Sequence, residues 1–97
     1  MFEEELDLTK FRVTIKTVIK NLESIENIPL DELKDEVINA FDGYHYEGEE
    51  CVKFGEGWDI TQDGEYVLNV GIDHKYAYEF SVYITVKDSN ATIKNVL

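Results

Sequence analysis

The 97 residues of this chain are enough for one domain with its own hydrophobic core. Apolar residues make up 43% of the sequence, which argues against disorder even though 31% of the residues are charged. The net charge of −12 disfavours direct binding to nucleic acid or to an anionic membrane, because both are polyanions, and it favours a basic partner. We therefore predict a single domain over residues 1–97.

The N-terminal stretch MFEEELDLTK is acidic and lacks the apolar segment of a signal peptide. No apolar run in the sequence approaches the ~20 residues that span a bilayer. The single cysteine cannot form an internal disulfide, whereas small secreted domains usually carry several. These features predict a cytoplasmic protein with no membrane partner.

The first predicted element is a helix over about residues 8–26, which Asp7 or Thr9 is placed to cap. The segment 11–16 is also rich in β-branched residues, so a strand there is the alternative. The prediction of a helix depends on apolar residues that recur at spacings of three and four, namely Leu8, Phe11, Ile15, Val18, Leu22 and Ile25.

A second helix is predicted over about residues 30–42. Pro29 ends the first pattern and suits the first turn of a new helix, and Gly43 is a natural C-cap. Apolar residues continue at helical spacing between these two signals, at Leu30, Leu33, Val37 and Phe41.

Strands and hairpins are predicted over about residues 44–97, because the apolar period changes there from 3.6 to 2. Asp63-Gly64 predicts a type I′ hairpin between residues 57–61 and 65–69. Tight connections are also expected at 73–75 and 88–90. The chain is therefore predicted to be an α+β domain in ααββββ order, with two N-terminal helices packed on one face of a four- to five-stranded antiparallel sheet.

Metal binding and catalysis find little support in the sequence. A structural zinc site needs about four ligands, and beyond carboxylates the chain offers only Cys51, His45 and His74. Residues 59–65 imitate the start of a calcium-binding loop, but Val70 stands where a bidentate acid is required. Cys51 with His45 or His74 is the remaining enzymatic alternative, although an acidic environment raises the pKa of a thiol. We predict no metal, no cofactor and no enzymatic activity.

The acidity is concentrated in the middle of the chain. Residues 21–73 contain fifteen acids and two lysines, whereas residues 1–20 are neutral and residues 74–97 carry +1. Solubility does not require such segregation. Aromatic residues lie between these acids, which is typical of a protein-binding surface, since aromatic side chains supply contact energy and charges steer and select the partner.

The predicted partner-binding residues lie between positions 44 and 65, and the acids of the second helix (Asp31, Glu32, Asp35 and Glu36) are expected to contribute. For Phe54 and Tyr66 a place in the core is the favoured alternative, and for Tyr44, Tyr46 and Trp58 both orientations stay open. The predicted set is Tyr44, Tyr46, Glu47, Glu49, Glu50, Glu56, Trp58, Asp59, Asp63 and Glu65.

Duplex DNA carries about one charge per 1.7 Å of axis, so the twelve net negative charges match roughly 20 Å of duplex. In charge, size and predicted architecture the chain is similar to the small acidic inhibitors made by phages and mobile elements, which include anti-CRISPR proteins and other DNA mimics. The resemblance assigns no residues. It implies a non-enzymatic inhibitor that acts in a bacterial host cell and occupies the basic nucleic-acid-binding surface of a partner, such as a nuclease.

Two alternatives remain open at this stage. One is an immunity protein or antitoxin that neutralises a toxin nuclease. The other is a homo-oligomeric structural module, with the apolar stripe between Leu8 and Ile25 or the last strand as its interface.

Overall fold

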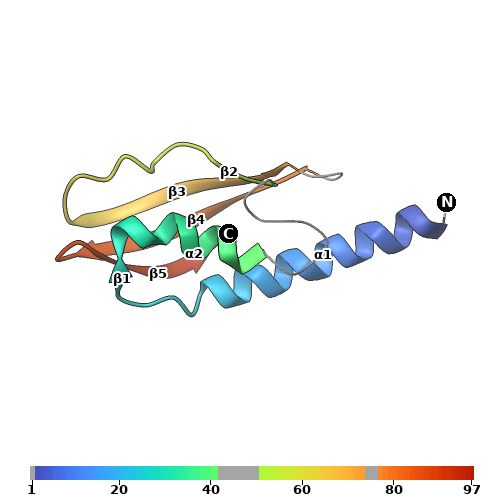
Figure 1. Cartoon of the computed structure of the whole chain (residues 1–97), viewed down its shortest axis with the longest axis horizontal. Helices are drawn as coiled ribbons and strands as arrows, with labels where there is room; N and C mark the ends of the chain where they lie inside the picture. The colour runs from blue at the N-terminus through green and yellow to red at the C-terminus, as the bar shows by residue number, and fades with distance from the viewer. Residues whose placement is uncertain (1, 42–50, 74–76) are drawn as a thin grey trace.

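The computed structural model describes residues 2–41, 51–73 and 77–97, and within the first helix the side chains from Leu8 onward. This part of the chain contains two α-helices and a five-stranded antiparallel sheet, which confirms the predicted α+β class (Figure 1). The elements are, in chain order, α1 (Phe2–Leu22), β1 (Ile28–Pro29), the 3₁₀ helix η1 (Leu30–Glu32), α2 (Leu33–Phe41), β2 (Val52–Phe54), β3 (Gly64–Asp73), β4 (Ala77–Lys87) and β5 (Asn90–Val96).

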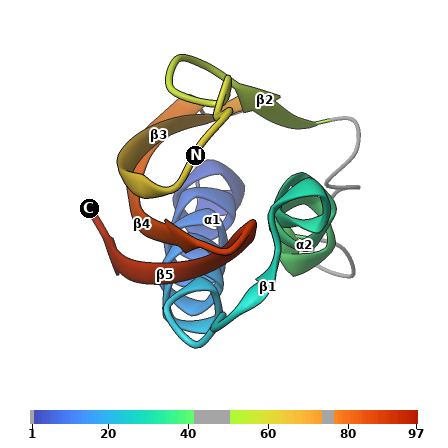
Figure 2. The ribbon, with the colours of Figure 1, turned by 90° about the vertical axis from the view of Figure 1, so that its left-hand side faces the viewer.

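The strands are arranged in the order β1-β5-β4-β3-β2, and every neighbouring pair is antiparallel. The sheet is curled, and Figure 2 shows both helices on its concave side. The sequence pattern did not predict β1, which lies between the helices and therefore departs from ααββββ order. A two-residue strand is too short to show a period, and its Pro29 is tolerated because β1 is an edge strand.

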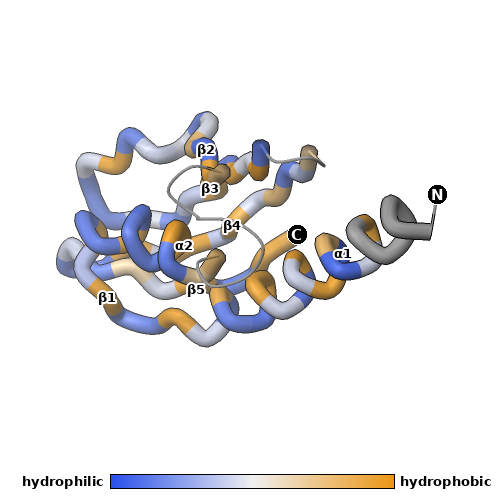
Figure 3. The backbone as a smooth tube through the Cα atoms, turned by 45° about the vertical axis from the view of Figure 1, so that its right-hand side comes forward, coloured by the Kyte–Doolittle hydropathy of each residue, from blue (hydrophilic) through white to orange (hydrophobic). Residues whose placement is uncertain are grey.

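Helix α1 includes residues 11–16, so the helical prediction for that segment is confirmed over the strand alternative. Apolar bands recur along α1 in Figure 3, and the stripe residues Phe11, Ile15, Val18 and Leu22 are buried. These four residues of the stripe are therefore part of the chain's own core, whereas Leu8 and Ile25 are half-buried. The molecule measures 50 × 22 × 20 Å, because the N-terminal part of α1 extends past the sheet (Figure 1).

The predicted bounds of the first helix were wrong at both ends, since α1 spans Phe2–Leu22 and not 8–26. Its start was missed because the apolar stripe that carried the prediction begins only at Leu8. Its end was placed too late because Ile25 continues the stripe in sequence but lies beyond the last helical turn. The carbonyl of Ile25 instead accepts a hydrogen bond from the Ile93 amide of β5 at 3.0 Å, which turns the chain towards β1.

The core contains buried residues of both helices and of the strands in one cluster. Helix α2 contributes Leu33, Val37 and Phe41, as its apolar spacing predicted. The predicted alternation buries every second residue from Leu68 to Ile72 on β3 and from Phe80 to Val86 on β4, whereas Tyr78 at the start of β4 is exposed. The largest fully buried strand side chains are Leu68, Val70, Val82 and Ile84. The first turn of the predicted second helix is η1, a 3₁₀ turn, and α2 proper begins at Leu33.

The Asp63-Gly64 hairpin was predicted wrongly. Strand β3 begins at Gly64, but its hairpin partner is β2, with Phe54 opposite Val70, so residues 55–63 form a long connection without a strand. The two-residue turn with positive φ at both central positions occurs between β4 and β5, at Asp88 (φ 53°) and Ser89 (φ 64°). Positive φ at both positions is what a type I′ turn requires.

Strand β5 contains a β-bulge at Lys94. Ile93 pairs with Ile84, but the next pair along β4 joins Tyr83 to Asn95, so Lys94 has no residue opposite it. The extra residue changes the alternation, so that Ile93 and Val96 are both buried although they are three positions apart. Lys94 and Asn95 are both exposed as a result.

Candidate functional site

A hollow lies at one end of the molecule, where η1, the connection 55–63 and the β4–β5 turn meet. Its volume is 560 Å³, and both apolar and polar side chains line it. The lining residues come from three separate parts of the sequence: Pro29, Leu30, Asp31, Lys34, Trp58, Ile60, Ser89 and Asn90. In Figure 1 this is the end opposite the N-terminus of α1.

The connection 55–63 is held against the edge of β3 by backbone contacts. The amide of Gly55 donates to the Asn69 carbonyl, and the Asn69 amide donates to the Glu56 carbonyl, each at 3.0 Å. Gly57 follows with φ 94°, and a Cβ atom at this position would come within 2.3 Å of the Val67 carbonyl oxygen. Glycine is therefore required for the chain to pass this close to β3.

Trp58 attaches the connection to the core. Its indole Nε1–H donates a hydrogen bond to the Asn69 carbonyl at 2.8 Å, and its ring meets the Phe54 ring edge-on at a centroid distance of 4.6 Å. The ammonium group of Lys34 on α2 lies 5.3 Å from the Phe54 ring centroid and 5.7 Å from that of Trp58. The half-buried Trp58 is thus a bridge between the edge of the sheet and α2, and it also lines the hollow.

Asp63 attaches the same connection to the β4–β5 turn. Its carboxylate accepts hydrogen bonds from the Asp88 amide at 2.9 Å and from the Ser89 amide at 3.4 Å. The Ser89 carbonyl in turn accepts a hydrogen bond from the Leu30 amide of η1 at 2.9 Å. Three segments far apart in the sequence are thereby joined around the hollow.

Replacing Asp63 with alanine is expected to lower the free energy of unfolding by about 1 kcal/mol, because two turn amides lose a charged acceptor. The matched control is Asp59→Ala, which removes the same charge from an exposed side chain that has no hydrogen bond among the described residues. The control is expected to change stability by less than about 0.5 kcal/mol. Urea unfolding followed by Trp58 fluorescence measures both variants, and equal effects would show that Asp63 has no special role in the turn.

The carboxylates around the hollow form what we call the acidic end: Asp31, Asp59, Asp63 and Asp88. All four are exposed. They belong to a wider pattern, since all eleven described acids of residues 21–73 are exposed, and no salt bridge to them is formed within the described part of the chain. Of the two lysines of that segment, Lys34 lines the hollow and lies over the rings of Phe54 and Trp58, so it places one positive charge beside the four carboxylates.

Only some of the predicted partner-binding residues lie together in the structure. Trp58, Asp59 and Asp63 come together at the acidic end. Glu65 lies across from Thr85 on the sheet. Glu56 is exposed beside the edge of β3, near Asn69. The predicted residues Tyr44, Tyr46, Glu47, Glu49 and Glu50 lie outside the described residues.

Phe54 and Tyr66 are half-buried and pack against the core, which is the orientation that the sequence favoured for them. Trp58, for which both orientations were open, is also half-buried against the core. The Tyr66 hydroxyl donates to the Gln62 carbonyl at 2.6 Å. These aromatic residues therefore support the connection 55–63 and do not form a free aromatic surface.

The described residues contain no group of three or more His, Cys, Asp or Glu side chains placed to hold a metal ion. Asp63, one of the acids in the calcium-loop pattern, already accepts hydrogen bonds from two backbone amides. Cys51 is buried in the core cluster, and its potential partners His45 and His74 lie outside the described residues. No helix in the described part of the chain has the length and hydropathy needed to cross a membrane.

Sequence reasoning did not select Asp88 and Lys34 as part of the site. Their positions depend on the β4–β5 turn and on the ring contacts of α2, which connect residues far apart in the sequence. No protein family model matches this chain, and no curated protein or solved structure matches it significantly.

Proposed function

We propose that this chain is a non-enzymatic binding protein whose acidic end occupies the basic, nucleic-acid-binding surface of a partner protein, in the manner of a DNA mimic. The observation that carries this proposal is the cluster of exposed carboxylates around an apolar hollow at one end of the molecule. The acids would supply steering and selectivity, and the lining residues Ile60 and Leu30 would supply apolar contact area.

The arrangement of charge supports this function better than a general role in solubility. The acidic end combines segments from three regions of the chain, and hydrogen bonds of Asp63 and Leu30 hold them in place. A preorganised set of charges loses less conformational entropy on binding than the same charges on flexible segments. The acids of α2, Asp35 and Glu36, extend the negative surface along the neighbouring helix.

The test is capture of a partner from a bacterial lysate on the immobilised protein at about 50 mM and about 500 mM salt, since electrostatic binding weakens steeply over this range. The proposal expects a nucleic-acid-binding protein that is released by high salt and by excess duplex DNA or RNA. Salt-insensitive binding, or a partner that binds no nucleic acid, would contradict it. A toxin nuclease encoded beside this chain would identify the immunity-protein form of the same function.

Two triple variants that have the same net charge test where the binding surface lies. The variant Asp31→Asn, Asp59→Asn and Asp88→Asn removes three charges from the acidic end and leaves Asp63 in place. The control Glu23→Gln, Asp73→Asn and Glu79→Gln removes three charges from exposed residues outside the acidic end. We expect the first to weaken binding at least about tenfold and the second by less than about threefold. Equal losses would show that only total charge matters.

A further inference from the structure

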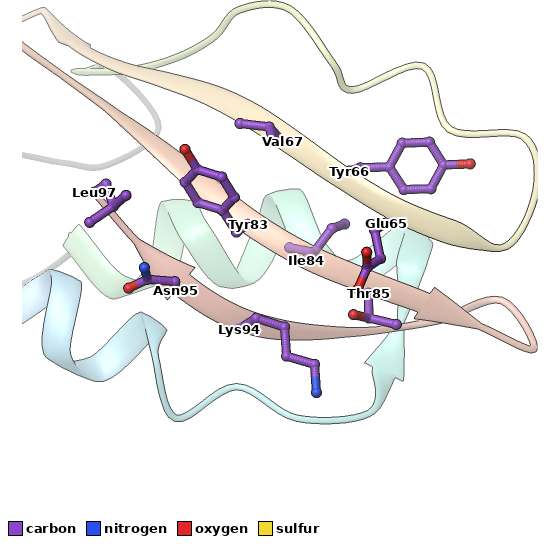
Figure 4. Close-up of a pocket in the computed structure, with 9 residues that line it drawn as sticks. All are labelled: Glu65, Tyr66, Val67, Tyr83, Ile84, Thr85, Lys94, Asn95 and Leu97. Atoms are coloured by element: carbon purple, nitrogen blue, oxygen red, sulfur yellow. The ribbon is translucent and has the colours of Figure 1, made fainter.

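The outer face of the sheet, which points away from the helices, is a second surface of distinct character. Three of the five large apolar side chains that are exposed among the described residues lie there: Val67 is 52%, Tyr83 36% and Leu97 68% exposed. They border a hollow of 470 Å³ across β3, β4 and β5. Figure 4 views this face with the helices behind it and shows Tyr83 between Val67 on β3 and Asn95 on β5. Such an apolar patch is typical of a protein interface.

The charges on this face are balanced, in contrast to the acidic end. By the alternation of the strands, its exposed charged residues within the described ranges are the lysines Lys53, Lys87 and Lys94 and the acids Glu65, Asp73 and Glu79. Two copies of a chain with a net charge of −12 repel each other over most approaches. On a balanced face the contacting charges themselves add no net repulsion to that cost.

The strand register places opposite charges on the two sides of β4. Glu65 of β3 pairs with Thr85, and Lys94 of β5 lies at the bulge beside Asn95, which pairs with Tyr83. Glu65 is therefore level with Thr92 across β4, and Lys94 lies one to two residues further along β5, an offset of about 5 Å that two long side chains can span. The apolar residues are divided in the same way, with Val67 on β3 and Leu97 at the end of β5.

We propose that two copies of this chain form a homodimer through this outer face, related by a two-fold axis that runs along β4. This rotation places β3 of one copy over β5 of the other. Lys94 of each copy then meets Glu65 of its partner copy, so that the contact is made twice, as in every isologous interface. Val67 of one copy lies over Asn95 of the other, with Leu97 two residues further along, and Tyr83 lies beside its own equivalent at the axis. Because the outer face is the convex side of the curled sheet, the contact is centred on β4 and the adjoining residues of β3 and β5.

The dimer is independent of the proposed inhibitory function. The hollow at the acidic end is lined by η1, α2, the connection 55–63 and the β4–β5 turn, and the two hollows share no lining residue. The acidic end of each copy therefore stays accessible in the dimer.

The test is sedimentation equilibrium of the full chain over about 5–500 µM, a range that covers the micromolar affinity of a small interface. We expect a reversible dimer. Lys94→Glu and Glu65→Lys should each raise the dissociation constant at least about tenfold, because each places two like-charge contacts in the interface. The double variant Lys94→Glu, Glu65→Lys should restore the wild-type value to within about threefold.

The matched control is Lys53→Glu, which makes the same charge change on β2, at the edge of the sheet beyond the reach of β5 in the partner copy. It should change the dissociation constant by less than about threefold. Circular dichroism confirms that each variant is folded. A monomer over the whole concentration range, or a double variant that stays as weak as the single ones, would overturn the proposal.

Discussion

Replacing Trp58 with alanine is expected to lower the free energy of unfolding by about 2–3 kcal/mol, towards the lower end of the range for removing a large aromatic side chain from a core. The half-buried indole supplies an edge-on contact to Phe54, a face for the Lys34 ammonium group and a hydrogen bond to the Asn69 carbonyl. All three contacts are lost together in alanine. Urea unfolding followed by far-UV circular dichroism measures the change without the tryptophan signal.

Two controls separate the contributions of Trp58. Trp58→Phe keeps an aromatic ring and removes the indole donor, and it should cost only about 1 kcal/mol because the Asn69 carbonyl still accepts from the Gly55 amide. Tyr83→Ala removes an aromatic residue from the exposed outer face and should cost less than about 1 kcal/mol. If Trp58→Ala left stability unchanged and abolished partner binding, Trp58 would be a contact residue and not a support of the fold.

Replacing Gly57 with alanine is expected to lower the free energy of unfolding by at least about 2 kcal/mol. The φ of 94° is unfavourable for any residue with a side chain, and the new methyl group would overlap the Val67 carbonyl oxygen at 2.3 Å. That oxygen belongs to the backbone of β3 and cannot move aside as a flexible side chain can. The connection 55–63 would have to detach from β3, and with it Trp58.

The control for Gly57 is Gly71→Ala, also beside β3 but in an open position. Its nearest atoms to a new Cβ are the Lys53 carbonyl oxygen at 3.8 Å and Glu79 Cγ at 3.9 Å, which are ordinary contacts. The substitution should change stability by less than about 0.5 kcal/mol. Trp58 fluorescence reports both variants during urea unfolding. Equal stabilities for the two variants would contradict the close approach of Gly57 to β3.

The elements that could be predicted from the sequence are the helices and strands that bury one face, because their apolar residues then recur with a regular period. The stripe from Phe11 to Leu22 and the alternation of β3 and β4 each repeat within a single segment, so the periods alone indicate helix and strand. A tight connection was predicted correctly at 88–90. The type I′ turn, however, was predicted at Asp63-Gly64 and occurs at Asp88 and Ser89. Local turn preferences indicate where the chain can reverse, but tertiary contacts decide which of two candidate turns forms.

The candidate site was less accessible to prediction because it is assembled from distant segments. The carboxylate of Asp63 binds amides 25 and 26 positions later in the chain, and no local pattern contains such information. Aspartate before glycine is equally consistent with a turn and with a carboxylate that caps another turn. The orientation of the Trp58 side chain, towards solvent or core, could not be predicted for a similar reason, since its partners Lys34 and Asn69 lie in two other elements.

The bulge in β5 allows the surface residue at position 94 to change independently of the buried residues on either side of it. In a regular strand, inserting or deleting one residue reverses the orientation of every side chain that follows. Here the extra residue is absorbed locally, and Ile93 and Val96 on either side of it both remain inside. Position 94 can therefore exchange charge, size or polarity over evolutionary time while the hydrophobic interior keeps its sequence constraints. The outer face of the sheet is thus free to acquire or lose a partner without a change of fold.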